Sequence, residues 1–159
     1  MKLIPSPNLP PAELALERFL PYRLSVLTNR ISTAIARIYD RRFALTVPEW
    51  RVMAVLGRFG AMSANAVCER TAMDKVRVSR AVARLAAAGR LERRPDAADR
   101  RRALLELTPR GRAVYDEIGP LALAVEARLL AQLSADDRAD LARLLPKLEA
   151  VAATSFAEG

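Results

Sequence analysis

Apolar residues recur at steps of three and four over the first part of the chain. The stripe consists of Leu24, Leu27, Ile31, Ile35 and Ile38. This spacing matches one face of a helix with 3.6 residues per turn, so it predicts a long helix that ends near residue 43. Pro21 has a fixed φ angle and no N–H, and we expect it to begin or kink the main part of this helix.

Capping residues predict three shorter helices in the middle of the chain. Thr46 and Glu49 have the spacing of a capping box, which starts the first. Ser63 is a suitable N-cap for the second. After a tight turn, Asp74 can cap the third, and Gly89 suits the position after its last turn. Two short helices joined by a tight turn predict a helix-turn-helix.

The pattern changes to that of a hairpin over residues 91–107. Residues 91–94 and 103–107 are predicted strands, joined by an exposed charged tip. Thr108 and Pro109 suit the start of the next helix, which Pro120 should bend, and residues 134–137 cap a last helix. The apolar stripes of these two helices consist of Val114, Ile118, Leu121, Val125 and Leu129, and of Leu141, Leu144, Leu145, Leu148 and Val151.

The order of these elements predicts a mainly α fold with a small β wing, which is a winged helix-turn-helix with N- and C-terminal dimerisation helices. We expect a flexible N-terminal arm over residues 1–11, a dimerisation helix region over 12–45, a DNA-binding domain over 46–108 and C-terminal dimerisation helices over 109–155. The outer helices carry more apolar surface than a small winged domain needs. A two-fold interface between two copies would bury it, and a monomer that buries every stripe internally is the alternative.

Positive charge is concentrated in the predicted DNA-binding domain. The 159-residue chain has a net charge of +8, and residues 69–102 alone hold eleven Lys and Arg and five Asp and Glu, a net +6. Such a surface attracts nucleic acid or anionic lipid. The basic composition of an Arg-rich proteome is the alternative, but clustering beside a helix-turn-helix favours nucleic acid.

Composition also excludes several kinds of chemistry. The chain has no histidine and a single cysteine, Cys68, so the commonest general base and a thiolate zinc cluster are absent. We therefore expect no enzyme activity, no metal and no cofactor. Asp136, Asp137 and Asp140 suit the start of a helix better than a metal site. No apolar run is long enough to span a membrane, and the first residues lack a signal peptide's apolar core, so we expect a cytoplasmic protein.

The helix after Asp74 is predicted to enter the major groove of double-stranded DNA. Its inner stripe consists of Val78, Val82 and Leu85. We expect Arg77 or Arg80 to contact a guanine and Val76 to contact a thymine methyl group. Phosphate contacts are expected from Lys75, Ser79 and Arg84. A solvated basic face without DNA is the alternative.

The hairpin carries the second group of predicted DNA contacts. These are Arg94, Arg100, Arg101 and Arg102, since a narrow minor groove attracts inserted arginine. Asp99 is placed to brace one of them by a charge-assisted hydrogen bond. A charged turn that is merely exposed is the alternative.

Two segments resemble the multiple antibiotic resistance regulator (MarR) family. Residues 99–111 are DRRRALLELTPRG and resemble its wing signature, D-x-R-x-x-x-L-x-L-T-x-x-G. Residues 85–93 are LAAAGRLER and resemble L-x-x-x-G-x-[ILV]-x-R. The resemblance covers about residues 20–150. It implies a homodimer with interlocking terminal helices, Arg101 in the minor groove and Asp99 supporting the wing.

The resemblance further implies a repressor of nearby genes that releases DNA on binding a small phenolic or other anionic ligand. The ligand pocket would lie between the dimerisation helices and the winged domain. Candidates are Phe19, Tyr22, Arg23, Arg30, Tyr39, Trp50 and Met53. Such a site suits an aromatic carboxylate or the acyl part of a coenzyme A thioester. Ordinary packing or a surface ion pair is the alternative for each residue, and Cys68 is interpreted as a small buried residue rather than a redox sensor.

These observations predict a homodimeric, sequence-specific regulator of transcription. Its partners would be double-stranded DNA, a second copy of the chain and a small-molecule effector, and not a membrane. Two-fold symmetry predicts a pseudopalindromic operator with half-sites one helical turn apart. A non-specific architectural DNA-binding protein is the alternative, and activation instead of repression stays open.

Overall fold

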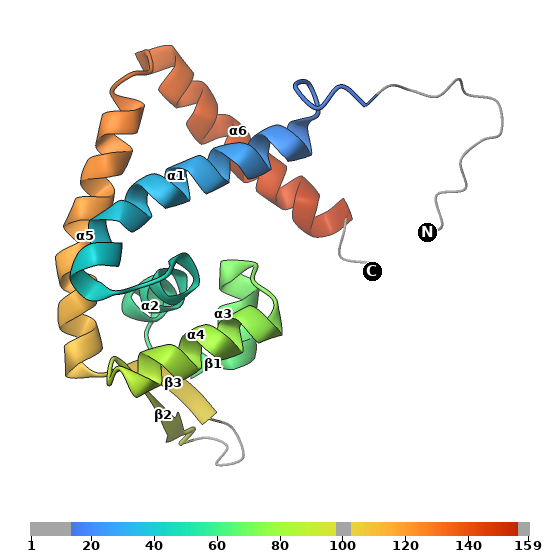
Figure 1. The fold of residues 1–159 in the computed structure, drawn as a ribbon. Coiled ribbons are helices and arrows are strands. Elements are labelled where there is room, and N and C mark those ends of the chain that lie inside the picture. Colours follow the sequence, from blue (N-terminus) through green and yellow to red (C-terminus); the bar gives the residue numbers. More distant parts are fainter. Residues whose placement is uncertain (1–13, 98–102, 156–159) are drawn as a thin grey trace. The chain divides into compact units, whose positions relative to one another are not determined.

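The computed structural model describes residues 14–97 and 103–155 (Figure 1). The elements in chain order are α1 (Leu20–Phe43), α2 (Val47–Phe59), β1 (Met62–Ser63), α3 (Ala64–Thr71), α4 (Lys75–Ala87), β2 (Leu91–Pro95), β3 (Ala103–Leu107), α5 (Pro109–Leu130) and α6 (Ala135–Ser155). The mainly α fold with a small β wing is therefore confirmed. The predicted N-terminal arm, residues 1–11, lies outside the described residues.

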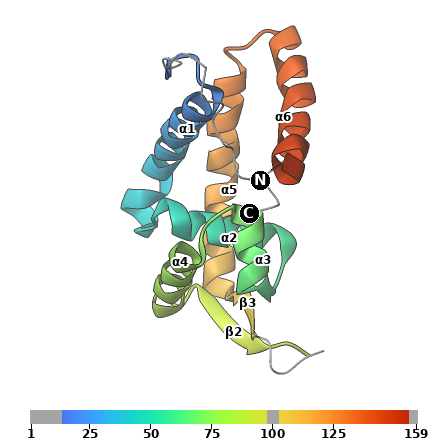
Figure 2. The same ribbon diagram turned by 90° about the vertical axis from the view of Figure 1, so that its right-hand side faces the viewer.

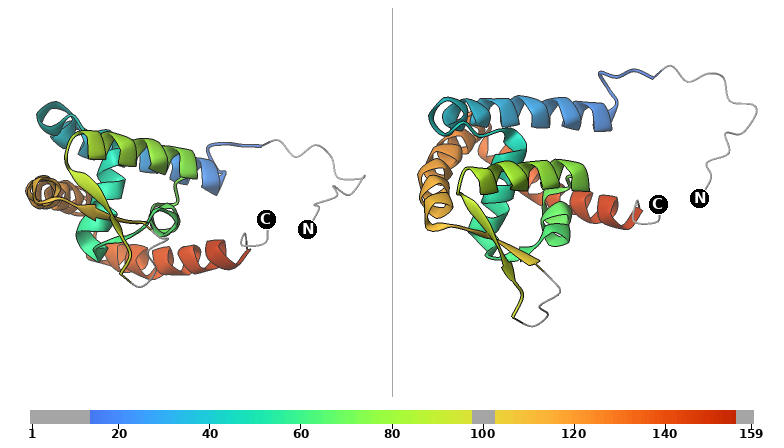
Figure 3. Two further views of the ribbon diagram at one scale, coloured as in Figure 1. Left: turned by 90° about the horizontal axis from the view of Figure 1, so that it is seen from below. Right: turned by 60° about the horizontal axis from the view of Figure 1, so that its bottom comes forward.

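The chain forms two compact units. One is Leu27–Val125, and the other combines the residues up to Val26 with those from Glu126 onward. The first unit contains the whole helix-turn-helix and its sheet. Figure 2 shows the hairpin of β2 and β3 extending beyond the ends of α3 and α4. Seen from below (Figure 3), β2 follows directly after α4 and lies beside β3, which leads into α5.

The core of the first unit includes the predicted inner stripe of α4 together with side chains from the other helices and the sheet. The largest fully buried side chains include Leu56 of α2, Val67 of α3, Val82 and Leu85 of α4, and Leu105 of β3. Burying such side chains supplies most of the favourable free energy of folding. Because one face of every helix in the motif is committed to this core, the opposite face of α4 is available to solvent.

Local capping signals hold where the sequence predicts helix starts. The Glu49 carboxylate accepts a hydrogen bond from the Thr46 N–H at 2.6 Å, the backbone contact that a capping box predicts for this glutamate. The same carboxylate also accepts from the Thr46 hydroxyl at 2.7 Å. Gly89 follows Ala88, the C-cap of α4, and has a φ of +67°, a conformation that glycine adopts without strain. The long first helix begins at Leu20 with Pro21 in its first turn, so the main helix starts where the proline predicted.

The sheet contains one strand that the sequence did not predict. β1 pairs antiparallel with β3, Met62 opposite Leu105, and gives the order β1-β3-β2. Two residues are too short to show the alternation by which strands are recognised. The strand holds the start of α3 against the hairpin, which ties the helix-turn-helix to the wing.

In the second unit, α6 is capped as predicted and has no buried side chain. The Ser134 hydroxyl donates to Asp137 at 2.6 Å, and the Asp137 N–H donates back at 3.1 Å. The Ser134 hydroxyl and the Ser134 N–H, which donates to the same carboxylate at 3.2 Å, lower the pKa of the Asp137 carboxyl. Every described side chain of α6, including its leucine stripe, is exposed.

Over the described ranges, no individual helix has the length and hydropathy to cross a bilayer. Helices α5 and α6 meet that standard only when they are combined across the sharp break between them.

Candidate nucleic-acid interface

One face of α4 is buried and the other is basic and exposed. Val78, Ala81, Val82 and Leu85 are buried. The six predicted DNA-contacting residues of the helix are all exposed: Lys75, Val76, Arg77, Ser79, Arg80 and Arg84. Val76, an apolar side chain, is 59% exposed, which leaves it free to contact an apolar group on a partner.

The first turn of α4 is held by its cap. Asp74 accepts a hydrogen bond from the Arg77 N–H at 2.8 Å, and its second oxygen lies 3.3 Å from Arg77 Nε. Arg77 is therefore tied to the helix start by two contacts with one carboxylate. Arg80 and Arg84 have no ion-pair partner within residues 14–97 and 103–155, so their charges are available to an external anion.

A hollow of about 360 Å³ lies beside this basic helix. Thr46 and Pro48 from the start of α2 form one wall, and Arg77, Arg80, Ala81 and Arg84 of α4 form the other. The Glu49 side chain is 5% exposed, and its carboxylate accepts a hydrogen bond from the Thr46 hydroxyl, so it does not line the hollow. The hollow therefore combines a neutral wall with three guanidinium groups.

The hairpin is described only in its strands. Arg94 is exposed on β2, but its Nε lies 2.5 Å from the Glu106 carboxylate on the neighbouring strand β3. Its charge is partly compensated within the hairpin. Asp99, Arg100, Arg101 and Arg102 lie outside the described residues, so their roles stay predictions.

Arg90 forms a junction that sequence reasoning missed. Its N–H donates to Leu85 O at 2.9 Å, its carbonyl accepts from the Thr108 N–H at 3.1 Å, and its Nη2 donates to Phe43 O at 2.6 Å. The end of α4, the start of α5 and the end of α1 therefore meet at one residue. Its Nε is buried without a hydrogen-bond partner among the described residues. The position follows Gly89 in the recognised motif, but nothing in that spacing indicated a side-chain role.

The seven predicted ligand-pocket residues lie in three different places. Tyr39 and Met53 are fully buried. The centroid of the Trp50 ring lies 5.7 Å from that of Tyr39 and 6.0 Å from that of Tyr115, on which Trp50 stacks. Burial raises the pKa of Tyr39 to about 12, which keeps its hydroxyl neutral. Tyr39 and Met53 belong to the core of the first unit, and the partly buried Trp50 packs against it. Phe19, Tyr22 and Arg23 are exposed residues of the second unit.

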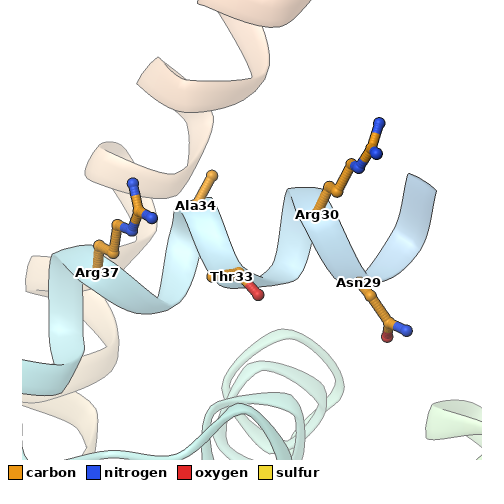
Figure 4. A pocket seen from close by; sticks show the side chains of 5 residues that line it. All are labelled: Asn29, Arg30, Thr33, Ala34 and Arg37. Carbon is orange, nitrogen blue, oxygen red and sulfur yellow. The ribbon is translucent and has the colours of Figure 1, made fainter. Parts of the chain in front are cut away.

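Arg30 lies at a separate hollow on α1, shown in Figure 4. The hollow measures about 310 Å³ and is lined by Asn29, Arg30, Thr33, Ala34 and Arg37. Arg30 and Arg37 project to the same side of the helix, with Ala34 between them (Figure 4). Arg37 was not among the predicted residues, although its spacing of seven from Arg30 places it two turns further along the same face.

Cys68 of α3 is half-buried, less enclosed than the sequence suggested. Within the part of the chain that the structure describes, no three His, Cys, Asp or Glu side chains gather in a way that could hold a metal ion.

A helix-turn-helix with an exposed basic second helix and a β-hairpin after it defines a winged helix-turn-helix DNA-binding protein. Residues 45–102 match the sequence model of the MarR family. A MarR family regulator from Silicibacter pomeroyi DSS-3 of known crystal structure is 32% identical, with a TM-score of 0.74 over 86% of this chain and 96% of that one. The chain belongs to the MarR family of transcription regulators, which the sequence motifs predicted.

Two further relatives are a transcriptional repressor and a protein whose DNA binding is regulated by a small molecule. The chain is 26% identical to the transcriptional repressor NicR of Pseudomonas putida over 77% of this chain and 84% of that protein. It is 28% identical to Bordetella bronchiseptica BpsR, whose structure concerns regulation of DNA binding by 6-hydroxynicotinic acid, with a TM-score of 0.73 over 84% and 94% of the two chains. These relatives are transcriptional regulators rather than enzymes.

Proposed function

We propose that this protein is a homodimeric, sequence-specific repressor that binds a pseudopalindromic operator and leaves it when a small aromatic anion binds. The observation that carries the proposal is the exposed basic face of α4 beside the wing. A helix of this kind fits the major groove, and the uncompensated charges of Arg80 and Arg84 would neutralise phosphates or contact guanine. We expect the protein to act in the cytoplasm, where the chromosome lies.

The exposed stripe of α6 supports the proposed homodimer. Leu141, Leu144, Leu145, Leu148 and Val151 are 39–58% exposed in the single chain. Patches of contiguous apolar side chains on a soluble protein mark surfaces that bind other proteins. A two-fold partner would cover the stripe with its own copy. The dimer would also present two copies of α4, one for each half-site of the operator.

The first test is selection of bound duplexes from a random library. We expect a pseudopalindrome with half-sites about one helical turn apart.

Replacing Arg101 with alanine should weaken binding of the selected duplex by about 1–3 kcal/mol, because a minor-groove contact is lost. An affinity unchanged by this substitution would remove Arg101 from the contacts. Equal affinity for all duplexes would instead favour the non-specific architectural alternative.

The second test concerns the effector. The proposed class is an aromatic carboxylate, supported by the paired Arg30 and Arg37 and by the control of BpsR with 6-hydroxynicotinic acid. Titration of 6-hydroxynicotinate and related aromatic carboxylates into the operator complex should find one that releases DNA. Arg30→Ala should raise the concentration of the carboxylate that releases DNA by about tenfold, because one hydrogen bond to a charged group is lost. Arg58→Ala, an exposed substitution on α2, is the control and should respond like wild type.

A further inference from the structure

The exposed face of α4 divides into two stripes with different surroundings. Arg77 and Arg84 are seven residues apart, which places them within about 20° of each other around the helix. Both are surface neighbours of the buried Ala81, at four residues before and three residues after it. They therefore lie at the edge where α4 meets the rest of its unit. Val76 and Arg80 are neighbours of each other and point away from the buried stripe.

The hollow lies between α4 and the start of α2, and its basic lining is Arg77, Arg80 and Arg84. Of these three residues, Arg80 lies furthest around the helix from the buried stripe, at the outer rim of the hollow. An α-helix with its side chains is about 10–12 Å across and the major groove is about 12 Å wide, so a helix in the groove fills it. Its outermost stripe then meets the base edges, and its two flanks face the sugar-phosphate backbones. The hollow with Thr46 and Pro48 is on such a flank.

We infer that this hollow binds a phosphate of the DNA backbone through Arg84, assisted by Arg77, and that Arg80 and Val76 are the side chains that meet base edges. Arg84 has no ion-pair partner in the described parts of the chain, whereas Asp74 already holds Arg77 in place. Arg84 is therefore the principal phosphate ligand and Arg77 a second, fixed one. The inference rests on the proposed function and changes the expectation that Arg77 reads a base.

The two residues from the start of α2 that line this site, Thr46 and Pro48, are uncharged. Pro48 has no N–H to donate, and the Thr46 hydroxyl donates to Glu49. Both residues would form a wall against which the backbone of one strand rests. This wall would make α2 a DNA-facing element outside the helix-turn-helix and the wing.

Lysine substitutions separate the two roles, because lysine keeps the charge for a phosphate but loses the planar fork that recognises guanine. Operator affinity is measured against salt concentration, and base preference is measured by library selection, for the full-length protein. Arg84→Ala should lower affinity for every duplex by roughly 5- to 150-fold. It should also reduce the slope of log K against log salt by about 0.9 per half-site. Arg84→Lys should restore the slope, and neither variant should change base preference.

Arg80→Lys should do the reverse, keeping the slope and losing preference at one position in each half-site. Arg143→Ala, at an exposed position on the side of α6 away from the leucine stripe, is the control and should match wild type in both measurements. The inference is overturned if Arg84→Ala leaves the slope unchanged or alters base preference, or if Arg80→Lys keeps the wild-type preference. Failure of the wild-type protein to select any sequence would contradict the proposed function itself, before the variants are compared.

Discussion

Replacing Gly111 with alanine is expected to destabilise the winged unit by about 3 kcal/mol, at the upper end of the usual cost of overpacking. An alanine Cβ at this position would overlap the carbonyl oxygen of Arg90 and lie 2.9 Å from its carbonyl carbon. The obstacle is backbone, which cannot rotate away as a side chain could. Relief would require the start of α5 to move, breaking the hydrogen bond from the Thr108 N–H to the Arg90 carbonyl.

Thermal unfolding followed by circular dichroism measures this effect, and the midpoint should fall by roughly 6–12 °C. Gly119→Ala is the matched control, because it lies in the same helix and a Cβ there meets no atom within 4 Å. Alanine in a helix interior is favoured over glycine by about 0.5–1 kcal/mol. Pro120 follows Gly119, and its ring crowds the Cβ of a preceding helical residue, which offsets this gain. The control should therefore change stability little. Equal effects of the two substitutions would show that the close approach to Arg90 does not constrain Gly111.

The structure also explains why the wing signature contains this glycine. Sequence reasoning placed Thr108 as a helix cap, and the structure confirms a hydrogen bond from the Gly111 N–H to the Thr108 hydroxyl at 3.1 Å. The same hydroxyl donates to Gly89 O at 2.7 Å. Gly89, Thr108 and Gly111, which are fixed positions of the two family motifs, are therefore the residues that join the end of α4 and the wing to α5. Spacing alone could not reveal these contacts, since the partners are about twenty residues apart.

Helices and caps were predictable because their signals are local. A capping box spans four residues, and an apolar stripe repeats within two turns, so both appear directly in the sequence. The strand β1 was missed because its only signal is a partner, Leu105, that is far along the chain. The same limit applied to Arg90, whose side chain reaches a carbonyl 47 residues earlier.

The candidate site was predictable in part for the same reason. The exposed face of α4 follows from helical periodicity, so its six residues could be named. The contribution of Thr46 and Pro48 could not, because it depends on how α2 lies against α4. Among the candidate ligand residues, periodicity could not separate Tyr39 and Met53, which are buried, from Arg30, which lines a hollow.

The other large effect is expected when the exposed stripe of α6 is charged. The double variant Leu144→Glu/Leu148→Glu should convert a dimer into monomers, because a two-fold interface would bury four carboxylates without partners. Operator affinity should then fall by at least about a hundredfold, since binding to two linked half-sites exceeds binding to one by roughly 10²–10⁴. Sedimentation velocity and a gel-shift titration measure the two quantities.

The matched control is Ala139→Glu/Ala150→Glu, which adds the same charge to exposed positions on the opposite side of the same helix. This variant should stay dimeric and bind the operator with an affinity close to that of wild type. Circular dichroism should show equal helix content in both variants, which separates a lost interface from a lost fold. A leucine variant that stays dimeric would place the interface elsewhere. A monomer that keeps full operator affinity would show that one copy of α4 is sufficient, and the two-fold operator would then lose its physical basis.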